Sequence, residues 1–189
     1  MTYPPTRSPR RVIRPAQRRD ADQIARLHTQ GWQQGYRGLL PDYYLHSIDL
    51  EATRQRWLDH FDAPSYLQLL VCADAAGQLF GFTSIGRCFD ADCTDEWELW
   101  DLWVDADHRS RGIGAELLGA ALQLAPAQRD VTVWVLGANQ RGLDFYQRHG
   151  AVFDNRSRYT GQAQAVIIRD VRLRWSAHTR AQRWPGRDR

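Results

Sequence analysis

The sequence predicts a single α+β domain, in which about four helices cover a mixed, mostly antiparallel sheet of six to seven strands. Residues 67–85 form two apolar runs around a short turn, which is typical of a β-hairpin. Residues 96–136 contain a strand, a helix with an apolar stripe and a fully apolar strand, which indicate a right-handed parallel crossover. Residues 166–175 alternate apolar and charged side chains, as in an antiparallel strand with one solvated face.

The other elements follow from helix caps and chain-breaking residues. A short first strand ends at Pro15, and the next helix starts with Asp20 as its N-cap and is broken by glycines from Gly31 onward. Asn139 caps a last helix, which Gly150 ends. The expected strands cover 12–13, 67–73, 79–85, 96–104, 131–136, 151–153 and 166–175, and the expected helices start at 20, 50, 113 and 140.

Composition excludes several classes of protein. With 189 residues, of which 43% are hydrophobic and 11% aromatic, the chain can bury one full core. No apolar run approaches the ~20 residues that span a bilayer, and the N-terminal segment lacks the apolar stretch of a signal peptide. The spacing of Cys72, Cys88 and Cys93 indicates neither a disulfide framework nor a zinc site. We therefore expect a cytoplasmic protein without a metal.

The positive charge lies at the two ends of the chain. All 25 basic residues are arginine, and the net charge is +3. Residues 1–19 carry six arginines and no acid, and residues 176–189 carry four arginines and Asp188, which leaves −6 on the body. A nucleic-acid-binding domain would place positive charge on a folded face. We expect disordered basic tails at 1–10 and 176–189, a single domain at 11–175, and no nucleic-acid or membrane partner.

A polar turn between a strand and a helix contains Arg109, Arg111, Gly112 and Gly114. The first N–H groups of a helix are unpaired and bind phosphate, and glycines let a ligand approach the backbone. A Walker loop needs a lysine, which the chain lacks, and a Rossmann fingerprint needs glycine where Leu117 stands. The turn is therefore expected to hold a pyrophosphate of another carrier.

The turn resembles the coenzyme A loop of the GNAT superfamily of N-acetyltransferases, whose pattern is Arg/Gln-x-x-Gly-x-Gly/Ala. Residues 109–114 supply that pattern as Arg-Ser-Arg-Gly-Ile-Gly. The preceding strand at 98–105 reads Glu-Leu-Trp-Asp-Leu-Trp-Val-Asp and is similar to the family's strand, although Ala106 replaces the usual proline. These two matches are adjacent and in the family's order.

A third match follows downstream. Asn139 and the pair Phe145-Tyr146 stand in the family's order, with Gly142 where alanine is usual and Ala151 where an aromatic residue is usual. The strong resemblance covers residues 96–151. It implies the GNAT fold, an α/β/α arrangement around a twisted sheet, and acetyl-CoA as co-substrate without a metal.

The resemblance also implies site residues. Tyr146 would be the general acid that protonates the departing thiolate, and the main chain of the strand before the loop would stabilise the oxyanion. The implied coenzyme-binding residues are Leu102, Trp103, Val104, Arg109, Ser110, Arg111, Gly112, Ile113, Gly114, Ala115, Asn139 and Tyr146.

Glu98 is the candidate base, acting directly or through a water. It shares strand parity with Trp100, Leu102 and Val104 and can then face the cleft, unless a β-bulge shifts the parity. Glu96 and Asp101 are alternatives. The acidic run from Asp90 to Glu98 is further expected to attract a cationic amine.

The acceptor is the least defined part of the site. Trp32 and Tyr36, in an aromatic-rich segment that also holds Tyr43 and Tyr44, are the candidate acceptor-binding residues. They favour a small cationic or aromatic amine, with a protein amine as the alternative. A GNAT-fold sensor that binds acyl-CoA without catalysis is the alternative function, and the family resemblance implies that a homodimer can form.

Overall fold

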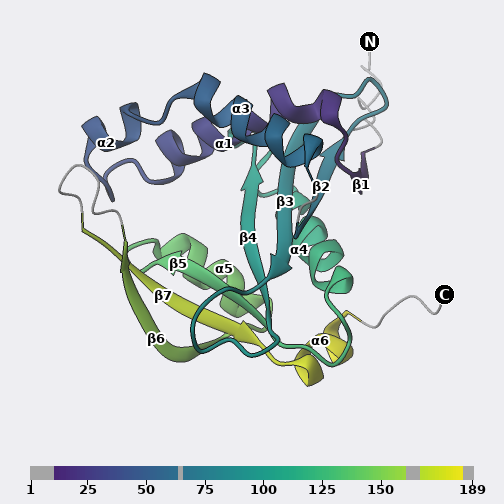
Figure 1. The fold of residues 1–189 in the computed structure, drawn as a ribbon, viewed down its shortest axis with the longest axis vertical. Helices are drawn as coiled ribbons and strands as arrows, with labels where there is room; N and C mark the ends of the chain where they lie inside the picture. Colours follow the sequence, from purple (N-terminus) through teal and green to yellow (C-terminus); the bar gives the residue numbers. More distant parts are fainter. Residues whose placement is uncertain (1–10, 64–65, 161–166, 185–189) are drawn as a thin grey trace, which may run out of the picture.

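The computed structural model describes residues 11–63, 66–160 and 167–184, which form a seven-stranded mixed sheet with helices on both faces (Figure 1). The strands are β1 (Val12–Pro15), β2 (Leu67–Ala73), β3 (Leu79–Arg87), β4 (Trp97–Val104), β5 (Val131–Leu136), β6 (Val152–Thr160) and β7 (Ile168–Trp175). The helices are α1 (Ala21–Gly35), α2 (Asp42–His46), α3 (Leu50–Asp62), α4 (Ile113–Leu124), α5 (Gln140–Arg148) and α6 (Ala177–Arg183), with 3₁₀ turns η1 (Arg18–Asp20) and η2 (Ala106–His108).

The strand order is β1-β2-β3-β4-β5-β7-β6, and every neighbouring pair is antiparallel except β4 and β5. The predicted α+β class with a mixed, mostly antiparallel sheet is confirmed. The parallel pair is short, because only Trp97 and Glu98 of β4 meet Val131 and Thr132 of β5. Beyond these residues the two strands separate.

Helices pack on each face of the sheet through separate apolar clusters. On one face, α1 and α3 bury Ile24 and Trp57 against Phe82 of β3. On the other face, α4 buries Leu118 and Leu122 against β3, β4 and β5. The two faces therefore have independent cores, and β4 runs between them.

A β-bulge at Trp100 changes which residues of β4 share a face. Ser84 pairs with Asp101 and Ile85 with Leu99, so Trp100 has no partner on β3. After the bulge, Leu102 packs with the α4 side, whereas Trp103 packs with the α1 side. Glu98 follows the parity of the residues before the bulge, so the expectation that it shares a face with Leu102 and Val104 is wrong.

Three helix predictions need correction. Gly31 does not end α1, which continues to Gly35, because the Trp103 ring packs where a side chain at position 31 would stand. The described residues form six α-helices instead of about four, because α2 and α6 are not among the predicted helices. Helix α6 lies in the region predicted to be a disordered tail.

Arg180 explains why α6 is ordered. Its buried guanidinium donates to the carbonyl oxygens of Leu122 and Ala125 (2.5 and 2.8 Å), which lack partners where α4 ends. Trp184 packs on Gly119 of α4. The tail prediction is therefore wrong for residues 177–184, while residues 1–10 and 185–189 lie outside the described part of the chain.

The cysteine prediction also needs correction. Cys88 and Cys93 form a disulfide, with their Cα atoms 6.1 Å apart, and Cys72 is a buried free thiol. The bond closes the loop between β3 and β4. No helix in the described part of the chain is both long and apolar enough to cross a bilayer.

Candidate active site

A cleft of about 480 Å³ opens where β4 and β5 separate. Its lining includes residues 99–104 of β4 and 133–135 of β5, together with residues from the start of α4 and from α5. Because β4 has no partner strand on this side, its main-chain groups are available to a ligand. The splayed strands therefore form a slot lined by backbone.

The start of α4 forms one end of the cleft. Gly112 has a left-handed φ of 84°, which turns the chain into the helix, and Ser110 has a φ of 60°. The first hydrogen bond of the helix runs from Glu116 N to Gly112 O (3.0 Å), so the three preceding amides have no partner in α4. Gly114 and Ala115 line the cleft at this point. The helix thus presents N–H groups and its positive dipole end to a ligand.

Three guanidinium groups line the same cleft, from Arg109, Arg141 and Arg148. In the described part of the chain, no carboxylate lies within ion-pair distance of any of them. Burial and the nearby Arg141 charge lower the pKa of Arg109. Unpaired cations beside free helix amides are suited to a polyanion such as a diphosphate.

Ten of the twelve predicted coenzyme-binding residues line this cleft. Arg111 and Ile113 do not, because Arg111 offers its carbonyl to Arg11 (2.8 Å) and the Ile113 side chain is buried beneath the helix. Arg141 and Arg148 were missed by sequence reasoning. They lie seven residues apart on α5 and therefore share one helical face, a signal that the motif comparison did not use.

Two tyrosines, Tyr36 and Tyr146, line the cleft between β4 and α5. Burial raises the pKa of both phenols, that of Tyr36 to about 12, and Asp101 contributes to both shifts. Both are therefore neutral proton donors at pH 7. Trp32 does not line the cleft; it packs behind Tyr36, with ring centroids 4.8 Å apart.

Asp101 is the carboxylate that reaches the cleft. It accepts hydrogen bonds from Ser84 Oγ (2.7 Å) and from Trp103 Nε1 (3.3 Å). His28 Nε2 lies 3.8 Å from its Oδ1 atom. These contacts orient Asp101 on the side of β4 that α1 covers.

Glu98 lies on the same face of β4 but does not line the cleft. Its side chain is 3% exposed, and burial, assisted by Asp90, raises its pKa to about 7. Arg158 and Arg172 partly oppose that shift. Glu98 therefore titrates near neutral pH, which suits a proton acceptor.

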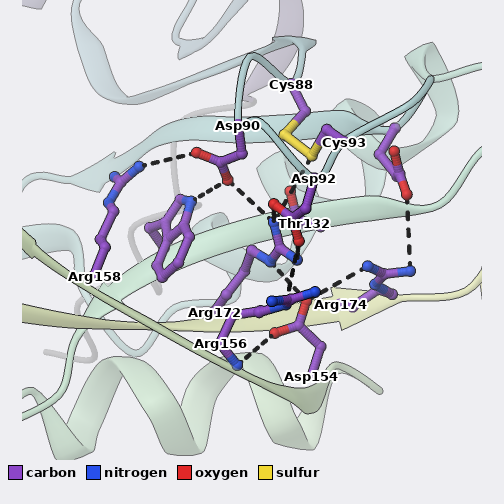
Figure 2. Close-up of polar contacts among 12 residues, drawn as sticks. Cys88, Asp90, Asp92, Cys93, Thr132, Asp154, Arg156, Arg158, Arg172 and Arg174 are labelled. Atoms are coloured by element: carbon purple, nitrogen blue, oxygen red, sulfur yellow. Dashed lines mark hydrogen bonds and ion pairs between the residues drawn. A yellow bond between two sulfur atoms is a disulfide. The ribbon is translucent and has the colours of Figure 1, made fainter.

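The acidic run before β4 is paired with arginines, as Figure 2 shows. Arg172 is 1% exposed and forms ion pairs with Asp90 (3.1 Å), Asp92 (2.6 Å) and Asp154 (2.6 Å), a group called here the Arg172 cluster. Asp95 pairs with Arg129, and Glu96 lies 3.9 Å from Arg174. The expectation that this run attracts cations is therefore not supported, because arginines neutralise it.

Comparisons with known proteins identify the fold and the family. Residues 29–151 match the model of the acetyltransferase (GNAT) family. The N-acetyltransferase YuaI of Bacillus subtilis is 26% identical over 166 residues, which cover 87% of this chain and 92% of the relative. An L-methionine sulfoximine/L-methionine sulfone acetyltransferase of Pseudomonas aeruginosa is 28% identical over 117 residues, 61% of this chain and 67% of the relative.

Solved structures of acetyltransferases have a similar fold. The PaiA N-acetyltransferase of Thermoplasma acidophilum, in complex with coenzyme A, has a TM-score of 0.70 at 18% identity and covers 88% of this chain and 99% of its own. This likeness concerns the fold. Together with the family match over residues 29–151, it means that the chain belongs to the GNAT family of acetyl-CoA-dependent N-acetyltransferases.

Proposed function

We propose that the protein moves an acetyl group from acetyl-CoA directly to a primary amine, with Tyr146 as general acid. One observation carries the proposal: a single cleft is lined by three arginines that form no ion pair in the described part of the chain, and by Tyr146 and Asp101. The acceptors named for the Pseudomonas relative are small, which supports a small amine here.

The residues of the cleft fit coenzyme A. The free amides at the start of α4, together with Arg109, Arg141 and Arg148, would hold its phosphates. The β4 main chain at 102–104 and Asn139 would line the rest of the carrier. When acetyl-CoA is bound, its thioester supplies the carbonyl group that an amine can attack.

The acceptor amine must first lose a proton. A lysine-like amine with a pKa near 10.4 is neutral in only about 1 molecule in 2,500 at pH 7, a penalty of ~4.6 kcal/mol. Asp101, which lines the cleft, would bind the ammonium form, and Glu98, with a pKa of about 7, would take the proton through a water. Burial acts on Glu96 as well, but backbone N–H groups outweigh it and lower its pKa, which makes it the weaker base.

The transfer forms an N–C bond and breaks a C–S bond. The amine, which has already given its first proton toward Glu98, supplies the electron pair. The sulfur leaves with the electrons of the C–S bond, and the neutral Tyr146 phenol donates a proton to it. The second proton of the nitrogen, released as the amide forms, then returns the Tyr146 phenolate to its neutral form. The unpaired edge of β4 offers main-chain dipoles to the negative charge that develops on the carbonyl oxygen.

A thiol-release assay with acetyl-CoA and a broad set of amines tests the proposal. Tyr146→Phe is expected to lower kcat by ~10²-fold and to leave the affinity for coenzyme A unchanged. Tyr159→Phe, at a residue outside the cleft, is the matched control and should not change either quantity. If the protein binds coenzyme A but releases no thiol from acetyl-CoA in the presence of any amine tested, it would instead be a sensor.

A further inference from the structure

A second cavity, of about 540 Å³, adjoins the coenzyme cleft on the α1 and α3 face of the sheet. Two residues, Trp100 and Asp101, line both cavities, so the bulge of β4 lies at their junction. The other lining residues are His28, Arg56, Trp57, Asp59, His60, Ala63, Tyr66 and Leu67. Its volume is in the range of small-molecule sites.

The walls of this cavity are mainly aromatic. Trp57 is buried at its base, while Tyr66 and Trp100 are 53% and 37% exposed. Phe89, 59% exposed, adds a ring beside them: its centroid is 4.7 Å from that of Tyr66 and 6.2 Å from that of Trp100. Large exposed aromatic rings gathered at one cavity mark a binding surface rather than core packing.

The disulfide loop holds one of these rings. Cys88 and Cys93 close the loop on either side of Phe89, and Asp90 of the same loop binds Arg172. The ring therefore belongs to a loop that is fixed at both ends. A preformed aromatic rim lowers the entropy that a ligand must lose on binding.

One carboxylate, that of Asp101, lies where the two cavities meet. Burial lowers the pKa of His28 and of His60, so both imidazoles are neutral at pH 7. Arg56 donates to His28 Nδ1 (3.2 Å), and Asp59 accepts from Gln55 (2.8 Å) on the helix surface. Asp101 is thus the anionic group between the cavity and the thioester position.

We propose that this cavity binds the body of the acceptor and that the acceptor is a primary arylalkylamine, with its ring between Trp57, Tyr66 and Trp100 and its ammonium at Asp101. The inference rests on the proposed function, because the amine must reach a thioester held in the adjoining cleft. An aromatic ring gains contacts with the walls that an aliphatic group of equal size lacks. The ammonium gains from both the carboxylate and the adjacent indole faces.

The first test compares two amines with the same carbon skeleton, of which only one has an aromatic ring. The full-length protein is assayed for thiol release with 2-phenylethylamine and with 2-cyclohexylethylamine at saturating acetyl-CoA. We expect kcat/KM to be at least ~10-fold higher for the aromatic amine. Equal values for the two amines would overturn the arylalkylamine assignment while leaving the acetyltransferase proposal in place.

The second test fills the cavity. Ala63→Trp places an indole at a lining position that is exposed and has extended backbone, so the fold tolerates it. It should weaken calorimetric binding of 2-phenylethylamine to the coenzyme A complex at least ~10-fold, with the affinity for coenzyme A unchanged. Ala76→Trp, in the exposed turn before β3, is the matched control and should bind the amine like the original protein. Unchanged amine binding in Ala63→Trp would overturn the cavity assignment. If the unmodified protein itself does not bind coenzyme A, the proposed function is wrong.

Discussion

Two sets of arginines in the molecule differ in what neutralises them. Arg172 is 1% exposed and contacts three aspartates from the disulfide loop and β6. Arg109, Arg141 and Arg148 line the coenzyme cleft, and no ion pair joins them to a carboxylate in the described ranges 11–63, 66–160 and 167–184. A buried cation needs a fixed anion, whereas a cation that lacks one is available to a ligand.

The comparison separates stability from function. The Arg172 cluster ties the loop before β4 to the β6–β7 hairpin, and the Trp134 indole joins it by donating to Asp90 (2.7 Å). Trp134 also lines the cleft. We therefore expect changes in the cluster to affect folding most, and changes at the start of α4 to affect coenzyme binding most.

The largest expected effect is on stability. Arg172→Met leaves three aspartates without their shared partner, two of them partly buried, and removal of one side of a buried ion pair costs about 3–5 kcal/mol. Chemical denaturation should show this loss as a lower midpoint. Arg156→Met, which removes an exposed partner of Asp92, should cost less than about 1 kcal/mol. Equal losses in the two variants would contradict the special role of Arg172.

The next effect is on coenzyme binding. Gly112→Val puts a β-branched residue at a φ of 84°, so the start of α4 must rearrange and its amides no longer converge. We expect the affinity for coenzyme A, measured by calorimetry, to fall by ~10²-fold. Gly77→Val has the same backbone strain at a φ of 86° in an exposed turn, and should lose stability without losing affinity. Normal affinity in folded Gly112→Val would place the phosphates elsewhere.

Much of the fold could be predicted from local pattern. The hairpin at 67–85, the crossover at 96–136 and the alternation near Trp175 each depend on residues close in the chain, and the structure contains all of them. The helix α6 could not be predicted in this way. Its order depends on Arg180 reaching carbonyls 55 and 58 residues away, which no local pattern encodes.

The candidate site also contains features that local sequence predicts and features that depend on residues far apart in the chain. The turn at 109–114 is a local device, because glycines, a helix start and an arginine lie within six residues, and it lies in the cleft as expected. The Arg172 cluster, by contrast, involves pairs such as Asp90 and Arg172, which are 82 residues apart. A spacing rule cannot find such pairs, so the sequence alone indicates free negative charge in the acidic run, which the arginines neutralise in the fold.

A smaller effect on stability is expected from the disulfide that closes the loop between β3 and β4. Replacing both cysteines, as Cys88→Ser with Cys93→Ser, opens a short loop and should lower the free energy of unfolding by about 2 kcal/mol. Dithiothreitol should lower the Tm of the original protein to that of the double variant and leave the variant itself unchanged. If the reductant lowers both equally, the loss does not come from this bond.

The smallest effect tests whether Glu98 acts on protons. Its pKa of about 7 lies above the ordinary value, so its protonated form stabilises the fold at low pH, and that contribution is lost as pH rises through about 7. Glu98→Gln should therefore gain stability relative to the original protein between pH 5 and pH 8. If Glu98 is also the base, the ratio of kcat/KM for the original protein to that for Glu98→Gln should rise roughly tenfold from pH 6 to pH 8.

The ratio is used because the ionisation of the amine affects both proteins equally and cancels. Glu96→Gln is the matched control, since the carboxyl of Glu96 has a lowered pKa and is charged throughout this pH range. A stability difference that changes with pH, combined with a rate ratio that does not, would make Glu98 a buried acid without a catalytic part. The task of taking the amine proton would then fall to Asp101, the carboxylate that lines both cavities.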